Sequence, residues 1–262
     1  MNVVVVYPGR FHPFHKGHKA TYDYLTKKFG EANVYVATSG VQSPIDSPFS
    51  YTDKVTMMTK MGVPASKIVK VKNPYQAQEI TQEVPDPENT ALIFAVSEKD
   101  KERFKFGKKK NGEPSYMQPY QEKKKLEPLT KHAYVIQTPK VDFKVRGANT
   151  DSASQIRKRY SDGNENDKIA IITDLYGEAD AAIKDIFDKR LASAKEVQDV
   201  VYKKAPLDAN VIHKTPRVGM MEHRAKVAKL IQTVLLAEQR AREAYEPINE
   251  DLIEDYLPEK RL

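Results

Sequence analysis

The 262-residue chain contains no cysteine. Disulfide bonds, thiolate nucleophiles and cysteine metal sites are therefore excluded together, and such a composition suits a reducing compartment. No apolar run approaches the ~20 residues that cross a bilayer, so the sequence predicts no membrane span. The N-terminus enters a short apolar run and lacks the basic and long apolar regions of a signal peptide. We expect a cytoplasmic protein.

Tryptophan is also missing, so any aromatic surface at a ligand site must come from the 9 phenylalanines and 14 tyrosines. Negative charge is in the minority: 43 lysines and arginines oppose 36 acidic residues, a formal net charge of +7. This excess favours anionic partners but does not distinguish nucleotide phosphates from nucleic acid. Hydrophobic residues make up 40% of the chain, which is enough for a real core.

Segments with strand and helix patterns alternate along the first two thirds of the chain. β-Branched or apolar runs predict strands at residues 3–7, 33–38, 68–71, 91–96 and 134–137. Apolar residues at helical spacing predict helices at 19–29, 52–61 and 154–160. Such alternation is typical of βαβ units. We therefore expect an α/β protein in three layers, with an open parallel sheet of Rossmann-like type.

Two regions depart from this alternation. Residues 99–131 are polar, rich in lysine and interrupted by proline, which predicts a charged insertion or a long mobile loop. Beyond it, helices are predicted at 179–191 and 193–202, and a long amphipathic helix at 219–245. We place a boundary near residue 192, between a domain at 1–192 and a helical C-terminal extension at 193–262.

A stretch rich in histidine and glycine, PGRFHPFHKGH at residues 8–18, joins the first strand to the first helix. Open α/β sheets bind ligands at this position, outside the carboxyl ends of the strands. Gly9 lets the backbone approach a ligand, and Gly17 lets the loop enter the helix tightly. His15 and His18, three residues apart at a helix start, point to the same side. Because a helix N-terminus attracts anions, the stretch predicts a phosphate site.

The segment GRFHPFHKGH resembles the HxGH signature of the nucleotidyltransferase superfamily, which has a cytidylyltransferase-like fold of the HUP type. Its GRF-xPFH variant is most similar to the nicotinamide mononucleotide (NMN) adenylyltransferases. A second motif of that family, S-x-S/T-x-I-R, is matched by residues 152–157. Weaker similarities lie at 47–58 and 96–100. The resemblance covers about residues 1–190.

The resemblance implies direct transfer of a nucleotidyl group. A phosphate oxygen of the acceptor attacks the α-phosphorus of a nucleoside triphosphate, ATP being favoured, and pyrophosphate leaves; NMN is the expected acceptor and NAD the product. His15, His18 and Arg157 would be the catalytic residues, with both imidazoles donating to triphosphate oxygens and Arg157 forking onto the β- and γ-phosphates. The expected nucleotide-binding residues are Gly9, Arg10, Phe11, Gly17, Ser152 and Ser154.

Magnesium would be carried by the triphosphate with mostly water ligands, so no dedicated protein site for the ion is expected. A zinc site built from His12, His15 and His18 is a rival interpretation. It is disfavoured because Pro13 keeps His12 off the helical face.

Other interpretations stay open beside this one. The acceptor could be phosphopantetheine, or the enzyme could transfer a cytidylyl group to a small phosphate. Ser152 and Ser154 could be ordinary helix N-caps. The chain could also be a nucleotide-binding structural protein that associates with itself or a protein partner through the 219–245 helix. The lysine runs at 108–110 and 123–125 lack an aromatic RNA-binding signature, so a nucleic-acid partner is not expected.

Overall fold

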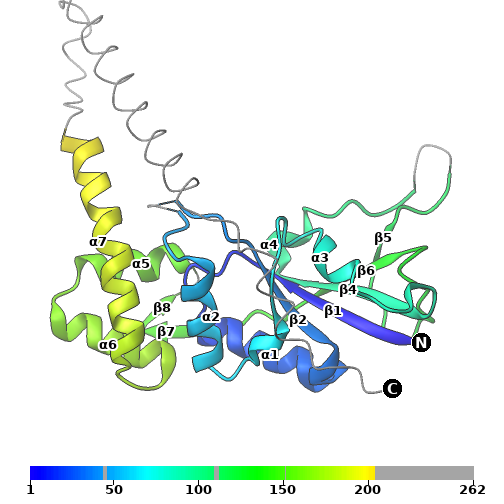
Figure 1. Ribbon diagram of the computed structural model, residues 1–262, viewed down its shortest axis with the longest axis horizontal. Helices are drawn as coiled ribbons and strands as arrows, with labels where there is room; N and C mark the ends of the chain where they lie inside the picture. Colours follow the sequence, from blue (N-terminus) through cyan, green and yellow to red (C-terminus); the bar gives the residue numbers. More distant parts are fainter. Residues whose placement is uncertain (44–45, 109–111, 151, 204–262) are drawn as a thin grey trace, which may run out of the picture. The chain divides into compact units, whose positions relative to one another are not determined.

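The computed structural model describes residues 1–43, 46–108, 112–150 and 152–203. At the centre of its sheet lies β1 (Asn2–Pro8), whose run of valines suits a strand covered on both faces. It pairs in parallel with β2 (Val34–Thr38) on one side and β4 (Thr90–Val96) on the other. The sheet is completed by β3 (Ile68–Lys70), β6 (Ala133–Gln137) and β5 (Met117–Pro119). The order is β3-β2-β1-β4-β6-β5, and every described pairing is parallel (Figure 1).

Alternate residues of the strands face two separate hydrophobic layers. Val5 of β1 belongs to the larger cluster, together with buried residues of α1 (Lys16–Phe29), α2 (Tyr51–Lys60) and the later helices. Val6 belongs to the smaller cluster, beside Ile80 of the short helix α3 (Gln78–Thr81). Because successive side chains of a strand point to opposite faces, this division shows a three-layer arrangement. The predicted α/β fold with a parallel sheet is confirmed.

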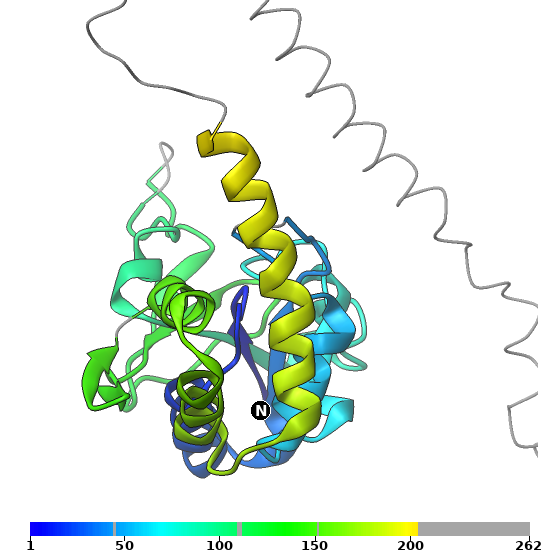
Figure 2. The same ribbon diagram turned by 90° about the vertical axis from the view of Figure 1, so that its left-hand side faces the viewer.

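The later helices pack on the larger layer. They are α5 (Ala153–Asp162), α6 (Glu165–Tyr176) and α7 (Ala181–Lys203). Phe187 of α7 is fully buried, with its ring 5.0 Å from the rings of both Phe49 and Tyr160. Arg190 adds an ion pair to Asp53 of α2, with Nε 2.7 Å from Oδ2. Figure 2 shows α7, in yellow, beside α2. The remaining short helices are α4 (Glu98–Lys101), η1 (Glu31–Asn33), η2 (Ala65–Lys67) and η3 (Pro87–Asn89).

The structure corrects the expectation for residues 99–131. This segment is not only a loop, because β5 joins the edge of the sheet beside β6, with Met117 opposite Ala133. Three residues with a proline at the end carry too little periodicity to predict a strand, and only the neighbouring edge supplies its partners. The antiparallel hairpin of β7 (Phe143–Val145) and β8 (Ala148–Thr150) was also not predicted.

The helix expectations need three further corrections. α1 begins at residue 16, three residues before the predicted start, because His15 serves as its N-cap. α6 was not predicted at all. Where two helices were expected at 179–202, α7 is one continuous helix through residue 192. The division of the chain into two domains at that residue stays a prediction.

The predicted helix at 219–245 and most of the proposed C-terminal extension lie outside the described residues. Within the described part, no helix has both the length and the apolar character needed to span a membrane.

Candidate active site

The loop between β1 and α1 is built around the ring of Phe11. This residue has a φ of 51°, in the left-handed region, and its side chain is buried. The ring lies edge-on to Tyr7 at 5.3 Å and to His18 at 5.0 Å. A Cβ atom on Gly9 would stand only 2.5 Å from the Phe11 ring. Gly9 therefore makes room for Phe11, which in turn supports the imidazole of His18.

The first turn of α1 determines which ring nitrogen of His18 carries the proton. The backbone N–H of His15 donates to Nδ1 of His18 at 3.3 Å. Since Nδ1 accepts this hydrogen bond, a neutral His18 carries its proton on Nε2. The two imidazole rings stack with centroids 3.7 Å apart. The geometry leaves Nε2–H of His18 as the donor that a ligand can use.

Both histidines are neutral at physiological pH. Burial lowers the pKa of His15 to about 3, and His15 is only 7% exposed. Burial, followed by the neighbouring His15, also lowers the pKa of His18 well below its usual value. Two cations in stacked contact would repel each other, whereas two neutral rings do not. The pair can therefore donate hydrogen bonds to phosphate oxygens without contributing formal charge.

The cleft in front of these histidines has a volume of about 700 Å³. Its walls come from the carboxyl ends of β1, β4 and β6, the first turn of α1, and the N-terminal end of α5. Seven of the predicted site residues line it: Gly9, Arg10, Phe11, His15, Gly17, His18 and Ser152. The described lining also carries several charged side chains, namely Glu98, Lys99, Asp100, Arg103, Lys140 and Asp142.

The second predicted motif reaches the cleft at Ser152. Its Oγ accepts from the backbone N–H of Gln155 at 3.4 Å, so this serine is the N-cap of α5 as well as a cleft residue. Ser154, two residues further along the chain, has its Oγ 3.1 Å from Ser152 Oγ. Among the described residues, Ser154 and Arg157 are not part of the cleft lining. Their contacts with a triphosphate stay a prediction.

Arg157 instead supports the loop between β1 and α1, which lies within residues 8–18 and is called the histidine loop below. Its Nη1 donates to the carbonyl oxygen of His12 at 2.6 Å. From α6, the hydroxyl of Tyr176 donates to the carbonyl of Phe14 at 2.7 Å. The ring of His12 is 4% exposed and its Nδ1 accepts from the backbone N–H of Phe49 at 3.3 Å. His12 therefore packs against the start of α2, away from His15 and His18.

Lys54 of α2 is a third support of the same loop, and sequence reasoning gave it no role. Its side chain is fully buried, and Nζ donates to Arg10 O at 3.2 Å, Thr38 Oγ1 at 3.1 Å and Ser39 O at 2.5 Å. Burial lowers its pKa to about 8. The signal was present in the sequence, because Lys54 shares a helix face with Met57 and Met58. Because a lysine is rarely buried unless its ammonium has partners, a lysine on an apolar helix face indicates a buried side chain with hydrogen-bond partners.

An aromatic residue at the far wall of the cleft was also missed. Tyr75 lies between β3 and α3, with the Arg103 guanidinium 4.7 Å over its ring. Arg103 Nε in turn lies 2.8 Å from Asp100 Oδ1. Burial, together with the nearby Asp100 carboxylate, raises the pKa of Tyr75 to about 12. Tyr75 thus stays protonated and offers a neutral ring.

The described residues hold no group of three or more histidine, cysteine or acidic side chains that could cage a metal ion. Carboxylates do line the cleft, among them Asp100 and Asp142. Because Mg²⁺ retains water ligands and binds through substrate phosphates with few protein carboxylates, this lining fits an ion carried by a triphosphate.

Known proteins share parts of this sequence and its fold. Two nicotinamide-nucleotide adenylyltransferases, from Methanocorpusculum labreanum and Sulfurisphaera tokodaii, are each 36% identical over 55 residues, which is 21% of this chain. The match covers 33% and 32% of those proteins, so the chain spans about a third of the curated relatives that it matches.

Two solved structures of a bifunctional NMN adenylyltransferase/ADP-ribose pyrophosphatase from Francisella tularensis are also similar. The one complexed with AMP and a manganese ion aligns with a TM-score of 0.43 at 17% identity, over 79% of this chain and 57% of that one. The other has a TM-score of 0.47 at 14% identity, over 79% and 58%.

A further match is to a family as a whole. The model of the cytidylyltransferase-like family matches residues 6–190, well over half of the chain, and this range includes both the histidine loop and the N-terminal end of α5. The chain belongs to the cytidylyltransferase-like family.

Proposed function

We propose that the protein transfers an adenylyl group from ATP to a phosphate-bearing acceptor and releases pyrophosphate. One observation carries the proposal: the His18 imidazole, with Nδ1 occupied by a backbone N–H, faces the same cleft as the N-cap of α5. Two motifs far apart in the sequence therefore present donors to one space. Helix N-termini and neutral imidazole N–H groups are suitable partners for phosphate oxygens.

In the proposed reaction, an acceptor phosphate oxygen forms a bond to the α-phosphorus of ATP while the bond to the bridging oxygen breaks. Pyrophosphate leaves with that electron pair, and no covalent enzyme intermediate is required. Catalysis of this type depends on positioning and on stabilising charge at the equatorial oxygens. His18 Nε2–H would donate to the α-phosphate, and the α5 N-terminus would face the leaving phosphates. A bound Mg²⁺ would neutralise part of the phosphate charge.

The preferred acceptor is NMN, which would give NAD. Support comes from the two relatives that are named nicotinamide-nucleotide adenylyltransferases. In this chain the cleft supplies the aromatic surface that such an acceptor requires, through Tyr75. Acceptors without a ring, such as phosphopantetheine, would make no use of that surface.

The test is pyrophosphate release with Mg²⁺, from ATP or CTP, with NMN, nicotinic acid mononucleotide or phosphopantetheine as the acceptor. We expect release with ATP and a pyridine mononucleotide. His18→Ala should lower kcat by ~10²-fold or more, the scale of losing a preorganised donor to the transition state. His132→Ala, a half-buried histidine outside the cleft, is the matched control and should keep its rate.

Circular dichroism would verify that both variants fold. Unchanged turnover in a folded His18→Ala variant would contradict the assignment of His18. The absence of pyrophosphate release from ATP with every acceptor would contradict the proposed function.

A further inference from the structure

Tyr176 is the last residue of α6, and its side chain reaches from there to the start of α1. Its hydroxyl donates to the carbonyl oxygen of Phe14 at 2.7 Å, across 162 positions of the sequence. Tyr176 is not among the described residues that line the cleft, and the proposed reaction gives it no part. What this contact does for the site depends on the peptide group that it holds.

The carbonyl held by Tyr176 belongs to the same peptide group as the N–H that contacts His18. Phe14 C=O and His15 N–H are the two ends of this group, which is planar and trans. In such a group the two bonds point in opposite directions, so fixing the carbonyl also fixes the N–H. The His15 N–H donates to His18 Nδ1 at 3.3 Å. Tyr176, the peptide group and the His18 imidazole therefore form one chain of hydrogen bonds that ends at Nε2–H in the cleft.

The link from His15 to His18 is the weak point of this chain. Its length of 3.3 Å exceeds the usual range of about 2.7–3.2 Å for an N–H donor, so its strength depends on the alignment of that donor. His15 is the N-cap of α1, so the hydrogen bonds of the helix do not hold its N–H. A donor on the carbonyl of the same peptide group also polarises the N–H and strengthens its bond. Both effects keep Nδ1 occupied and the proton on Nε2.

The Tyr176 hydroxyl is itself held firmly. Its ring meets Phe187 of α7 edge-on, with ring centroids 6.3 Å apart and the planes at 87°. Burial, followed by the nearby Asp180 carboxylate, raises the pKa of Tyr176 well above its usual value, so the hydroxyl keeps its proton. On the other side, Phe14 is fully buried and its ring lies 5.5 Å from the ring of His18. The last two described helices thus supply a fixed donor to the histidine loop.

We propose that Tyr176 is a positioning residue for the transfer reaction, and that it sets the tautomer and direction of the His18 donor through the Phe14–His15 peptide group. The inference rests on the proposed function, in which His18 Nε2–H stabilises the transition state. Without the hydroxyl, the peptide group can turn, Nδ1 loses its donor and His18 divides between its two neutral tautomers. Because Tyr176 does not line the cleft, its loss affects the chemical step more than the binding of ATP.

Tyr176→Phe keeps the aromatic ring and removes only the hydroxyl. We expect kcat for pyrophosphate release from ATP to fall by roughly threefold to tenfold, the rate equivalent of one net hydrogen bond. KM for ATP should stay within about twofold of the wild-type value. ¹⁵N NMR of the histidine ring nitrogens reports the tautomer in the absence of any substrate. The wild-type protein should show an unprotonated His18 Nδ1, and Tyr176→Phe a mixture of both tautomers.

Two other tyrosines allow the same substitution as a control. Tyr22 is buried in α1, and its hydroxyl has no hydrogen-bond partner among the described residues. Tyr22→Phe should keep both kcat and the His18 tautomer.

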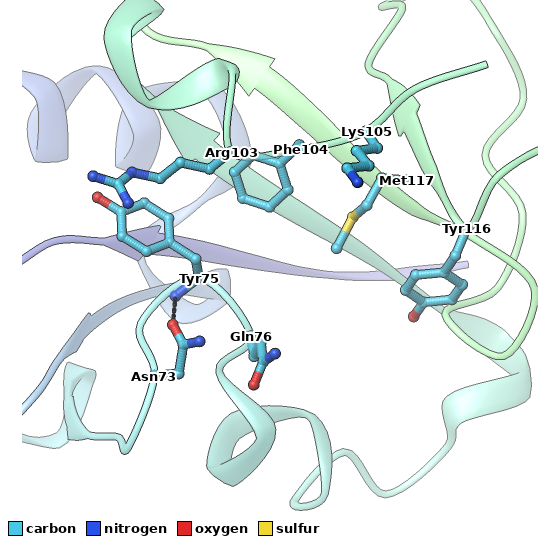
Figure 3. A pocket seen from close by; sticks show the side chains of 8 residues that line it. All are labelled: Asn73, Tyr75, Gln76, Arg103, Phe104, Lys105, Tyr116 and Met117. Carbon is cyan, nitrogen blue, oxygen red and sulfur yellow. Dashed lines mark hydrogen bonds between the residues drawn. The ribbon is translucent and has the colours of Figure 1, made fainter.

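The second control matches the hydrogen bond itself, because the Tyr116 hydroxyl donates to the carbonyl of Leu129 at 2.6 Å. Tyr116 lines a second pocket of about 450 Å³, which shares Tyr75 and Arg103 with the cleft. Figure 3 shows Tyr116 at the opposite end of this pocket from those two residues. Tyr116→Phe therefore loses an equivalent bond far from the histidine loop and should keep the His18 tautomer.

The two readouts separate positioning from a merely structural role, and circular dichroism verifies that each variant folds. A lower kcat together with a changed tautomer in Tyr176→Phe alone supports the inference. It is overturned by a wild-type tautomer or a wild-type kcat in Tyr176→Phe, or by the same tautomer change in a control, while the proposed function stands. If no acceptor yields pyrophosphate from ATP, the proposed function fails, and the tautomer of His18 in the three variants decides the inference by itself.

Discussion

At the scale of single residues, Lys54 shows how a charged group can be the structural centre of the histidine loop. Its ammonium satisfies two carbonyls and one hydroxyl in a position with no exposed surface. Burial of such a charge is costly, as the lowered pKa of about 8 shows. The cost is tolerable because all three protons have acceptors.

Replacing this lysine with methionine shortens the unbranched side chain by only one atom and removes the donors. Lys54→Met leaves the Arg10 and Ser39 carbonyls buried without this partner, so we expect the free energy of unfolding to fall by ~1–3 kcal/mol. Urea denaturation at pH 7 measures the change. Lys27→Met, at an exposed position of α1, is the control and should change stability by no more than ~0.5 kcal/mol. A Lys54→Met protein as stable as the control would show that the buried hydrogen bonds have no net value.

At the scale of elements, α1 and the β7–β8 hairpin meet at Gly17. A Cβ atom there would lie 2.9 Å from the ring of Phe143 and 3.1 Å from the ring of His15. Phe143 in turn packs on His15, with ring centroids 4.7 Å apart. The glycine was expected to ease the entry into the helix. The structure shows that it also lets the hairpin close over His15.

Gly17→Ala should therefore destabilise the protein by ~1–3 kcal/mol, the usual cost of overpacking, although alanine favours a helix. The same substitution in a Phe143→Ala background should cost less, because the ring that blocks the new methyl group is gone. A double-mutant cycle by urea denaturation measures the coupling. Additive effects of the two substitutions would contradict the contact as the cause.

At the scale of the whole described unit, α7 is joined to the larger hydrophobic layer by its buried face. Phe187 lies between Phe49 at the start of α2 and Tyr160 of α5, the two helices that support the histidine loop. We therefore regard α7 as part of the fold that holds the cleft.

Phe187→Ala should lower the free energy of unfolding by ~3–5 kcal/mol, the range for a fully buried phenylalanine. Asp185→Ala on the exposed side of the same helix should have an effect below ~0.5 kcal/mol. Thermal and urea unfolding would compare the two. If Phe187→Ala is as mild as the control, α7 does not belong to the core of this unit.

Local patterns in the chain predicted much of this architecture. β1, β2, β4 and β6 were found within one or two residues, because a continuous β-branched run has few alternatives to a buried strand. The histidine loop was located by its position between such a strand and a helix. Seven of the predicted site residues do line one cleft.

Long-range contacts decided the rest. β5 forms only because the edge of β6 is available, and Tyr75 reaches the cleft only because β3 lies beside β2 in the sheet. The sequence by itself determined the buried strands β1, β2, β4 and β6, the starts of α2 and α5 to within one residue, and the position of the histidine loop, since these depend on neighbours along the chain. Only the tertiary structure decided how the loop is supported by Lys54, Arg157 and Tyr176, and it also formed the second pocket beside the cleft. These features could not be predicted because hydrogen bonds between distant segments leave no periodic trace in a sequence.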